Sequence, residues 1–484
     1  MAEHAKAVDL AVVGHTNTGK TSLLRTLLRD EHFGAVADQP GTTRQVESAR
    51  LLDAHGRALL ILRDTPGLED AMGTLDHLDT LPASGSRPDG PERIRTLLDS
   101  PAAQNRFEQE CRVLKAVLQA DAALYVIDAR DPVLPKHRDE LALLAMCGRP
   151  ILPVLNFTHA AQADPAAWRT ALARQGLHVS VDFDTVVPPV DGEMRLLQRL
   201  ALLLERHAPA LQRLQDHLQA ERVERRRDAV RLIAELLVDA AALRLSCVDE
   251  PTAVAATARA LRARIRAREQ RCVEAMLKRY RFSAAVFPQH TLPLEGERWG
   301  MDLFHPQALR QFGIHVGKGM ATGAVAGATV DVLTGGLSLG AATLLGAALG
   351  GTWQGAGQWG RRLMSRLSGR REMTLDDPVL QLLGIRQLAL LRALEQRGHA
   401  ASQTIAPDTV SATGAAAGPA TPDGRADSVP PAQALPPPVQ DLLKEARSQP
   451  AWCAIEGPAE PDERRDAVIA ALADALQATL QAAA

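Results

Sequence analysis

The sequence predicts an α/β fold, in which helices cover both faces of a mostly parallel β-sheet, followed by an α-helical C-terminal region. Two observations carry this prediction. Over residues 8–205, short apolar runs alternate with stretches of helical periodicity, which is typical of parallel sheets with helices on both faces. Beyond residue 205, apolar residues recur at spacings of three and four, which indicates amphipathic helices.

The strand candidates are short apolar runs of buried-strand length. They lie at residues 8–13, 46–52, 58–63, 122–128, 151–157 and 177–183. The sequence DAHG between the second and third is typical of a turn. Residues 73–105 interrupt the alternation with Pro, Gly and Ser, so this stretch is predicted to be a long loop or lid.

Composition narrows the classes of function. The net charge of −2 over 484 residues gives no sign of a nucleic-acid-binding surface. The five cysteines are scattered, without metal-ligand spacing or a disulfide pattern. The N-terminus lacks a basic segment followed by an apolar run, so no signal peptide is expected. These features favour a cytoplasmic protein.

Four regions are expected along the chain. Residues 1–205 are predicted to form the α/β domain and residues 206–397 a helical domain. Residues 398–437 are rich in Pro and Ala and have too few large apolar residues to form a core, so they are predicted to be a disordered linker. Residues 438–484 are predicted to be a final helical segment.

A glycine-rich segment at residues 317–360 is predicted to form a helical hairpin. Its glycines recur four residues apart, which lets a second backbone approach closely. A tightly packed helix pair is the favoured interpretation. The alternative is a hairpin that dips into a membrane and gives the protein a peripheral membrane contact, because the uncharged segment is flanked by basic residues.

A phosphate-binding motif follows the first predicted strand. Residues 14–21, GHTNTGKT, match G-x-x-x-x-G-K-[ST]. The glycines let the loop curl so that its N–H groups point at phosphate oxygens, and the following helix adds positive charge at its N-terminus. Lys20 would reach the β- and γ-phosphates and the Thr21 hydroxyl would bind Mg²⁺. The predicted binding residues of this loop are Gly14, Asn17, Thr18, Gly19, Lys20, Thr21 and Ser22.

Two further segments are predicted to sense the γ-phosphate. In PGTTR at residues 40–44, Thr43 is expected to close on Mg²⁺, with Thr42 as the alternative. In DTPG at residues 64–67, Asp64 is expected to hold Mg²⁺ and the Gly67 N–H to meet the γ-phosphate. The predicted metal ligands are therefore Thr21, Thr43 and Asp64, and the predicted catalytic residues are Lys20, Thr43 and Gly67.

These three motifs, in this order, resemble the Era and TrmE branch of small GTPases over residues 8–205. The rest of the chain is similar to the partner half of a bacterial family that fuses such a domain to a C-terminal domain of unknown function. The resemblance implies a P-loop NTPase fold of the Ras and Era type, which binds GTP and GDP and hydrolyses GTP with Mg²⁺. It also implies a protein effector of unknown identity.

The sequence departs from the pattern of that family at the base-recognition segment. The resemblance implies N-K-x-D after the fifth strand, whereas residues 156–159 read NFTH. Asn156 is retained, and Phe157 can stack on a purine, so both are predicted to bind the nucleotide. His159 cannot accept two hydrogen bonds at once, and this loss is expected to weaken guanine recognition by about 1.5–3 kcal/mol. The candidate substitutes are Asp164, Asp182 and Asp184.

Hydrolysis is predicted to be slow. Leu68 stands where many small GTPases carry a glutamine that orients water. In the potassium-activated members of the resembled branch, an asparagine at the position of Asn17 helps to hold K⁺; the alternative is that Asn17 only shapes the loop. Glu69 and Asp70 are interpreted as exposed loop residues rather than water-positioning carboxylates.

The favoured function is a nucleotide switch that passes its state to the helical C-terminal half. The lost aspartate leaves an ATPase or a nucleotide-promiscuous NTPase as the first alternative. A membrane-associated scaffold whose assembly is controlled by nucleotide is the second.

Overall fold

The computed structural model describes residues 7–30, 33, 46–81, 89–189, 191–282, 303–304, 329–330, 370–397 and 435–482. The chain divides into two compact units. The first comprises Met1–Glu224 with Glu395–Ser402, and the second comprises Arg225–Leu394 with Gln403–Ala484. The division falls inside the long helix α8 (Ala208–Ala242), later than residue 205, where the sequence places the end of the first domain.

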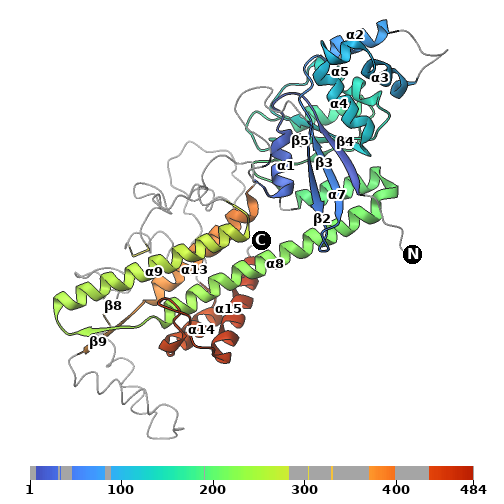
Figure 1. The fold of residues 1–484 in the computed structure, drawn as a ribbon. Coiled ribbons are helices and arrows are strands. Elements are labelled where there is room, and N and C mark those ends of the chain that lie inside the picture. Colours follow the sequence, from blue (N-terminus) through green and yellow to red (C-terminus); the bar gives the residue numbers. More distant parts are fainter. Residues whose placement is uncertain are drawn as a thin grey trace, which may run out of the picture. The chain divides into compact units, whose positions relative to one another are not determined.

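The first unit is built on a six-stranded sheet with the order β2-β3-β1-β4-β5-β6 (Figure 1). All neighbouring strands are parallel except β2, which runs antiparallel to β3 at one edge. The strands are β1 (Val8–Val13), β2 (Glu47–Leu52), β3 (Ala58–Asp64), β4 (Ala122–Asp128), β5 (Ile151–Asn156) and β6 (Val181–Asp182). Each strand coincides with one of the predicted apolar runs, so the mostly parallel sheet is confirmed.

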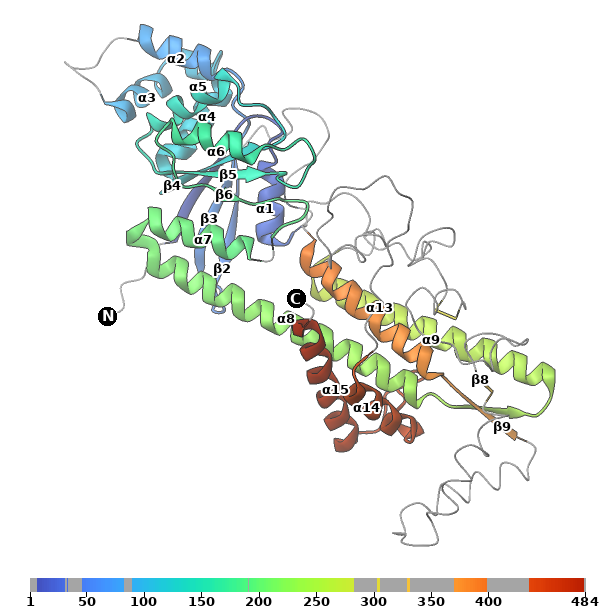
Figure 2. The same ribbon diagram turned by 180° about the vertical axis from the view of Figure 1, so that it is seen from behind.

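Helices cover both faces of this sheet (Figures 1 and 2). One face receives Val8, Leu10 and Val12 of β1 and packs against α1, α7 and the first part of α8. The other receives Ala11 and Val13 and packs against α2 to α6. Successive side chains of a strand point to opposite faces, so an unbroken apolar strand is buried on both. The helices are α1 (Lys20–Leu28), α2 (Ala71–Thr80), α3 (Gly90–Leu98), α4 (Glu108–Gln119), α5 (Pro135–Ala145), α6 (Pro165–Ala173) and α7 (Gly192–Leu203).

The prediction of a long loop at residues 73–105 is wrong. Most of this stretch forms α2, α3 and a 3₁₀ turn at Pro101–Gln104, while residues 82–88 lie outside the described part. Its polar residues cap helices. Asp70 accepts the Gly73 N–H at 2.9 Å, and Asp89 forms a capping box with Glu92. Asp70 and Asp89, which are of a residue type common in loops, therefore act here as N-terminal caps of helices.

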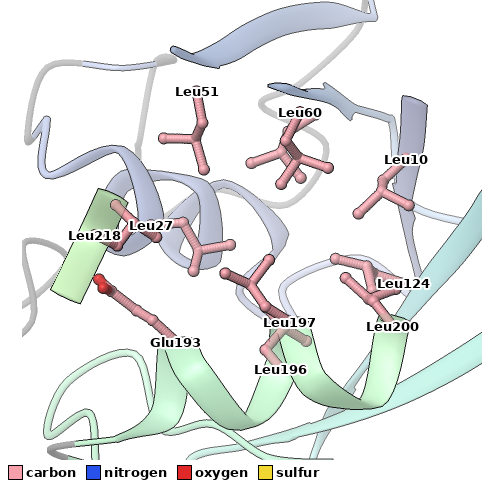
Figure 3. Close-up of a pocket in the computed structure, with 11 residues that line it drawn as sticks. Leu10, Leu27, Leu51, Leu60, Leu124, Glu193, Leu196, Leu197, Leu200 and Leu218 are labelled. Atoms are coloured by element: carbon pink, nitrogen blue, oxygen red, sulfur yellow. The ribbon is translucent and has the colours of Figure 1, made fainter. Parts of the chain in front are cut away.

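Leucines fill the space between the sheet and helices α1, α7 and α8 (Figure 3). Only 3% of the residues of the chain are aromatic, and Phe183 is the one fully buried ring among the described residues of this cluster. A small cavity remains, and its free space is about that of one water molecule. It is therefore a packing gap and no ligand site. Its lining is Leu10, Leu27, Leu51, Leu60, Leu62, Leu124, Glu193, Leu196, Leu197, Leu200 and Leu218.

The second unit is mainly helical, as predicted, and also contains a small antiparallel sheet with the order β7-β9-β8. Its helices share one hydrophobic core with the second half of α8. Leu435, at the end of the predicted linker, is buried in this core. The elements are β7 (Leu245–Val248), α9 (Pro251–Arg279), β8 (Thr329–Val330), β9 (Arg370–Thr374), α13 (Asp377–Gln396), α14 (Pro437–Arg447) and α15 (Glu463–Ala482).

A buried carboxylate ties three helices of the second unit together. Asp239 of α8 is 1% exposed and accepts hydrogen bonds from Arg268 of α9 at 2.8 Å and Arg465 of α15 at 3.1 Å. The Ala454 N–H adds a third at 3.0 Å. Burial of a charge is tolerable when it is paired in this way. The C-terminal helices are thus part of the same core as α8.

Most of the predicted glycine-rich hairpin and of the predicted linker lies outside the described residues. Within residues 317–360 the structure describes only β8, and within 398–437 only the last three residues. Among the helices that are described, none is long and apolar enough to cross a membrane.

The leucine-lined cavity leads to a prediction about stability. Leu197→Ala should lower the free energy of unfolding by about 2–5 kcal/mol, because it enlarges a gap that already exists. Leu202→Ala, on the same helix at a side chain 71% exposed, should change it by less than about 0.5 kcal/mol. Equilibrium urea unfolding of both variants tests this, and equal losses would contradict the assignment of the cavity.

Candidate nucleotide-binding site

The loop between β1 and α1 has the backbone that a phosphate-binding loop requires. Gly19 has a φ of 90°, and a Cβ there would lie 2.3 Å from the Asn156 Nδ2. Glycine alone meets both demands, the left-handed backbone and the close approach. Asn17 also has a left-handed φ, of 65°, which asparagine tolerates better than most residues.

Lys20 projects into this loop. Its Nζ donates hydrogen bonds to the carbonyl oxygens of Gly14 at 3.2 Å and His15 at 2.7 Å. The side chain is 7% exposed, and burial lowers the pKa of Lys20 to about 8, against the opposing charges of Asp64, Glu140 and Glu69. The ammonium group is thus held among the carbonyl oxygens of the loop, close to these carboxylates.

Thr21 and Asp64, two of the predicted metal ligands, lie together. The Thr21 hydroxyl donates to the Asp64 Oδ2 at 2.5 Å. The other carboxylate oxygen, Oδ1, is buried without a hydrogen-bond partner in the described part of the chain. Burial raises the pKa of Asp64 to about 6. A hydroxyl beside an unsatisfied carboxylate oxygen suits a hard divalent cation such as Mg²⁺. Thr43, the third predicted ligand, lies outside the described residues.

Gly67 and Leu68 are packed directly against the phosphate-binding loop. A Cβ on Gly67 would lie 2.2 Å from the Thr16 Oγ1 and 2.7 Å from the Thr16 N, so no other residue fits here. The Leu68 N–H donates to the Gly14 carbonyl at 3.1 Å, and the Leu68 side chain is fully buried. The predicted γ-phosphate sensor therefore touches the predicted phosphate loop.

Helix α4 holds this contact in place through residues that the motifs do not mark. The Gln109 Nε2 donates to the Gly67 carbonyl at 2.5 Å. The buried Glu110 accepts the backbone N–H groups of Glu69 at 3.2 Å and Asp70 at 2.9 Å. Both lie in the loop before α2, where Glu69 is exposed, as interpreted, and Asp70 is half-buried. Glu69 also accepts a bond from Thr16, and Asp70 caps α2.

A second buried carboxylate, Glu140, also supports the phosphate loop. Glu140 of α5 accepts hydrogen bonds from the Tyr125 hydroxyl at 2.6 Å and from the His15 Nδ1 at 2.9 Å. Both oxygens of Glu140 are thereby used, and the side chain is 2% exposed. The hydrogen bond between Glu140 and His15 fixes the position of His15, the loop residue that follows Gly14.

Asn156 joins the phosphate loop to the segment expected to bind the base. Its Nδ2 donates to the Thr18 carbonyl at 3.0 Å, and its Oδ1 accepts the N–H groups of Phe157 and Thr185, each at 2.9 Å. The residue has no exposed surface. Asn156 therefore links the phosphate loop at Thr18 to the segments at Phe157 and Thr185.

Phe157 takes the lysine position of the family pattern and lies against Gly19. A Cβ on Gly19 would be 3.3 Å from the Phe157 Cζ. The Arg130 guanidinium lies over the Phe157 ring at 4.0 Å from its centroid and is fixed by a two-bond pair with Asp128. An aromatic surface backed by a cation thus stands beside the phosphate loop.

Of the three aspartates considered as substitutes, only Asp184 approaches His159. Asp164 caps α6 through the Ala167 N–H, and Asp182 pairs with Arg169. The Asp184 Oδ2 lies 3.3 Å from the His159 Nδ1 and 3.2 Å from its backbone N. The sequence offered no signal that placed Asp184 beside His159, because the two residues lie 25 positions apart in the chain.

Comparison with known proteins gives two family matches. Residues 169–474 match the model described as a domain of unknown function (DUF3482), and residues 9–157 match the model described as a 50S ribosome-binding GTPase. The first match begins inside α6, so it includes β6, α7 and Asp184, which belong to the first unit.

The curated relatives cover only part of the chain. GTPase Der of Bartonella tribocorum is 26% identical over 199 residues, which are 39% of this chain and 35% of that protein. GTPase Der of Jannaschia sp. is 32% identical over 149 residues, which are 30% of this chain and 24% of that protein. The chain thus spans about a third or less of the length of these relatives.

Two solved structures each match part of the chain. Era of Aquifex aeolicus bound to GDP and AlF4⁻ is 18% identical, with a TM-score of 0.29, over 41% of this chain and 57% of that chain. The G domain of the Thermotoga maritima FeoB iron transporter is 18% identical, with a TM-score of 0.25, over 41% of this chain and 99% of that chain.

The geometry of Gly19 gives a test with a matched control. Gly19→Ala should weaken binding of a fluorescent GTP analogue about 100-fold or more, because the new Cβ would displace Asn156 as well as strain the backbone. Gly56→Ala shares the positive φ but has nothing within 4 Å of the new Cβ, so it should leave binding unchanged. Equal affinity of Gly19→Ala and the wild type would contradict the close approach.

Proposed function

Because the chain belongs to the family defined by the domain of unknown function DUF3482, here joined to an N-terminal GTPase domain, we propose that it is a GTP-operated switch. It binds GTP with Mg²⁺, hydrolyses it slowly and passes the state of the loops at residues 40–44 and 64–67 to its C-terminal half. The observation that carries this proposal is the convergence of Lys20, the Thr21–Asp64 pair and Gly67 on one loop.

The reaction we propose is in-line attack of water on the γ-phosphoryl group. The Lys20 ammonium group and the N–H groups of the loop stabilise the negative charge that develops on the phosphate oxygens. Thr21, Asp64 and Thr43 would hold Mg²⁺, which would supply positive charge beside the phosphates. Leu68 is buried and carries no polar group, so it cannot orient the attacking water, which supports slow turnover.

The switch contact is the packing of Gly67 and Leu68 on the phosphate loop. A γ-phosphate bound by the Gly67 N–H would compete with or reinforce the bond from Leu68 to Gly14. Gln109 and Glu110 of α4 form hydrogen bonds to the same segment, so a movement of Gly67 would change the contacts of this segment with α4. This supports a change of state that spreads beyond the nucleotide.

The partners we propose are GTP, GDP and a protein effector not yet identified. Within the described part of the chain all five cysteines are free thiols, four of them buried, which fits the proposed cytoplasmic location. The competing function is ATP hydrolysis, and the observation in its favour is His159 at the position of the guanine-binding aspartate. A scaffold that contacts membranes through residues 317–360 remains an alternative that liposome co-sedimentation tests.

The central claim is tested by removing Lys20. Lys20→Ala should abolish measurable binding of nucleoside triphosphate, because its ammonium is the charge that meets the β- and γ-phosphates. Lys115→Ala, at an exposed position of α4, is the matched control and should bind normally. Isothermal titration with GTP gives the affinities and circular dichroism checks the fold. Wild-type affinity in a folded Lys20→Ala variant would remove the proposal.

The proposed role of Asn17 in holding K⁺ has its own test. Turnover of GTP in potassium salts should exceed turnover in sodium salts by about tenfold or more, because a fixed positive charge at the transferring group is worth at least that factor. Asn17→Gly keeps the left-handed backbone but removes the side chain, so it should abolish the difference while GTP still binds. Equal wild-type rates in both salts would leave Asn17 a loop former.

A further inference from the structure

We propose that His159, oriented by Asp184, reads the purine base as a single hydrogen-bond acceptor. This inference rests on the proposed function, because it assumes that a nucleotide occupies the loop at Gly19. A site with one acceptor should bind GTP and inosine triphosphate (ITP) about equally, and both in preference to ATP. It would be a reader of 6-oxopurines, without the strict guanine selectivity that an aspartate gives.

Asp184 is fully engaged by its own chain. Its Oδ1 accepts the N–H groups of Val186 at 2.9 Å and Val187 at 3.1 Å. Its Oδ2 accepts the backbone N–H of His159 and faces the His159 ring. The side chain is only 4% exposed. Asp184 could read a base directly only by giving up these bonds, so we assign it a positioning role.

The contact with Asp184 fixes which nitrogen of His159 carries the proton. An ionised carboxylate can only accept, so the Nδ1 that faces it must be the donor. In the neutral ring the other nitrogen, Nε2, then holds a lone pair and accepts one hydrogen bond. The side chain is 62% exposed, and Nε2 has no partner in the described part of the chain.

The neighbours of His159 bind the base without selecting it. Phe157 offers an aromatic face, and stacking on an aromatic ring tolerates every base. Arg130 covers one face of this ring, so a base can stack on the other face only. The side-chain amide of Asn156 is hydrogen-bonded to Thr18, Phe157 and Thr185. We therefore assign the selectivity among purine bases to His159.

The edges of the three purines differ in what they offer to one acceptor. Guanine presents N1–H and the 2-amino group, and hypoxanthine, the base of ITP, presents N1–H alone. One acceptor uses one of these donors, so the missing 2-amino group should matter little. Adenine has a lone pair at N1, which would face the lone pair of Nε2 and weaken binding. Its one donor, the 6-amino group, lies where the other two bases carry the 6-oxo group, away from the position of N1–H.

The test is an affinity panel of GTP, ITP and ATP on the full chain. The wild type should bind GTP and ITP within about threefold of each other and ATP about tenfold more weakly, as expected for one hydrogen bond. His159→Ala should bring all three within about twofold. His159→Asp should favour GTP over ITP by about tenfold or more, since a second acceptor oxygen can then meet the 2-amino group. His178→Ala, an exposed histidine of the same unit, should match the wild type.

The outcomes separate this inference from the proposed function. Rejection of ITP by the wild type by tenfold or more, or an unchanged ratio of GTP to ATP in His159→Ala, would overturn the inference while the GTPase proposal stands. Tighter binding of ATP than GTP by the wild type would overturn both. If the histidine variants fail to fold, the ITP measurement on the wild type still decides.

Discussion

The side-chain amide of Asn156 makes three hydrogen bonds that join loops from three different parts of the sheet. Thr18 belongs to the loop after β1, Phe157 follows β5, and Thr185 follows β6. In a parallel sheet these loops gather at the carboxyl ends of the strands, but nothing in the strands fixes their spacing. A fully buried amide whose nitrogen and oxygen both have hydrogen-bond partners does so, and the positions of Gly19, Phe157 and His159 depend on it.

Around this fixed point the site concentrates charge that the core would normally exclude. Lys20, Asp64, Glu110 and Glu140 are each less than 8% exposed, and Asp64 keeps one oxygen unsatisfied. Burial of such groups lowers stability unless partners compensate. Glu110 and Glu140 accept hydrogen bonds from within the protein, Lys20 donates to two carbonyl oxygens, and Asp64 uses only one of its two oxygens. We propose that a phosphate and a cation complete the partners of Lys20 and Asp64. Ligand binding and the stability of this unit are therefore coupled.

The parts of the molecule that could be predicted from sequence are those whose structure depends on residues close together in the chain. A window of about ten residues is enough to recognise each strand, the phosphate loop and the DTPG segment. The mostly parallel sheet follows from the order in which strands and helices alternate. The helices at 71–98 were missed because Asp70, Asp89 and Pro91 serve equally as turn and cap residues. Gln109 and Glu110 could not be found, and Asp184 could not be singled out from the three candidate aspartates, because their roles depend on contacts with residues 25 to 42 positions away.

Helix α8 has a consequence for where the nucleotide-binding unit ends. The leucines at 211, 214 and 218 close one face of the sheet, although the motifs that define the unit finish at residue 159. Farther along the same helix, Ile233 and Leu237 belong to the other core. A gene shortened to the motif-bearing residues would leave that face of the sheet open to water and lose Thr185 from the amide of Asn156. Both units take core residues from the single helix α8. Either unit could therefore be moved into another protein only if the core positions supplied by α8 were replaced.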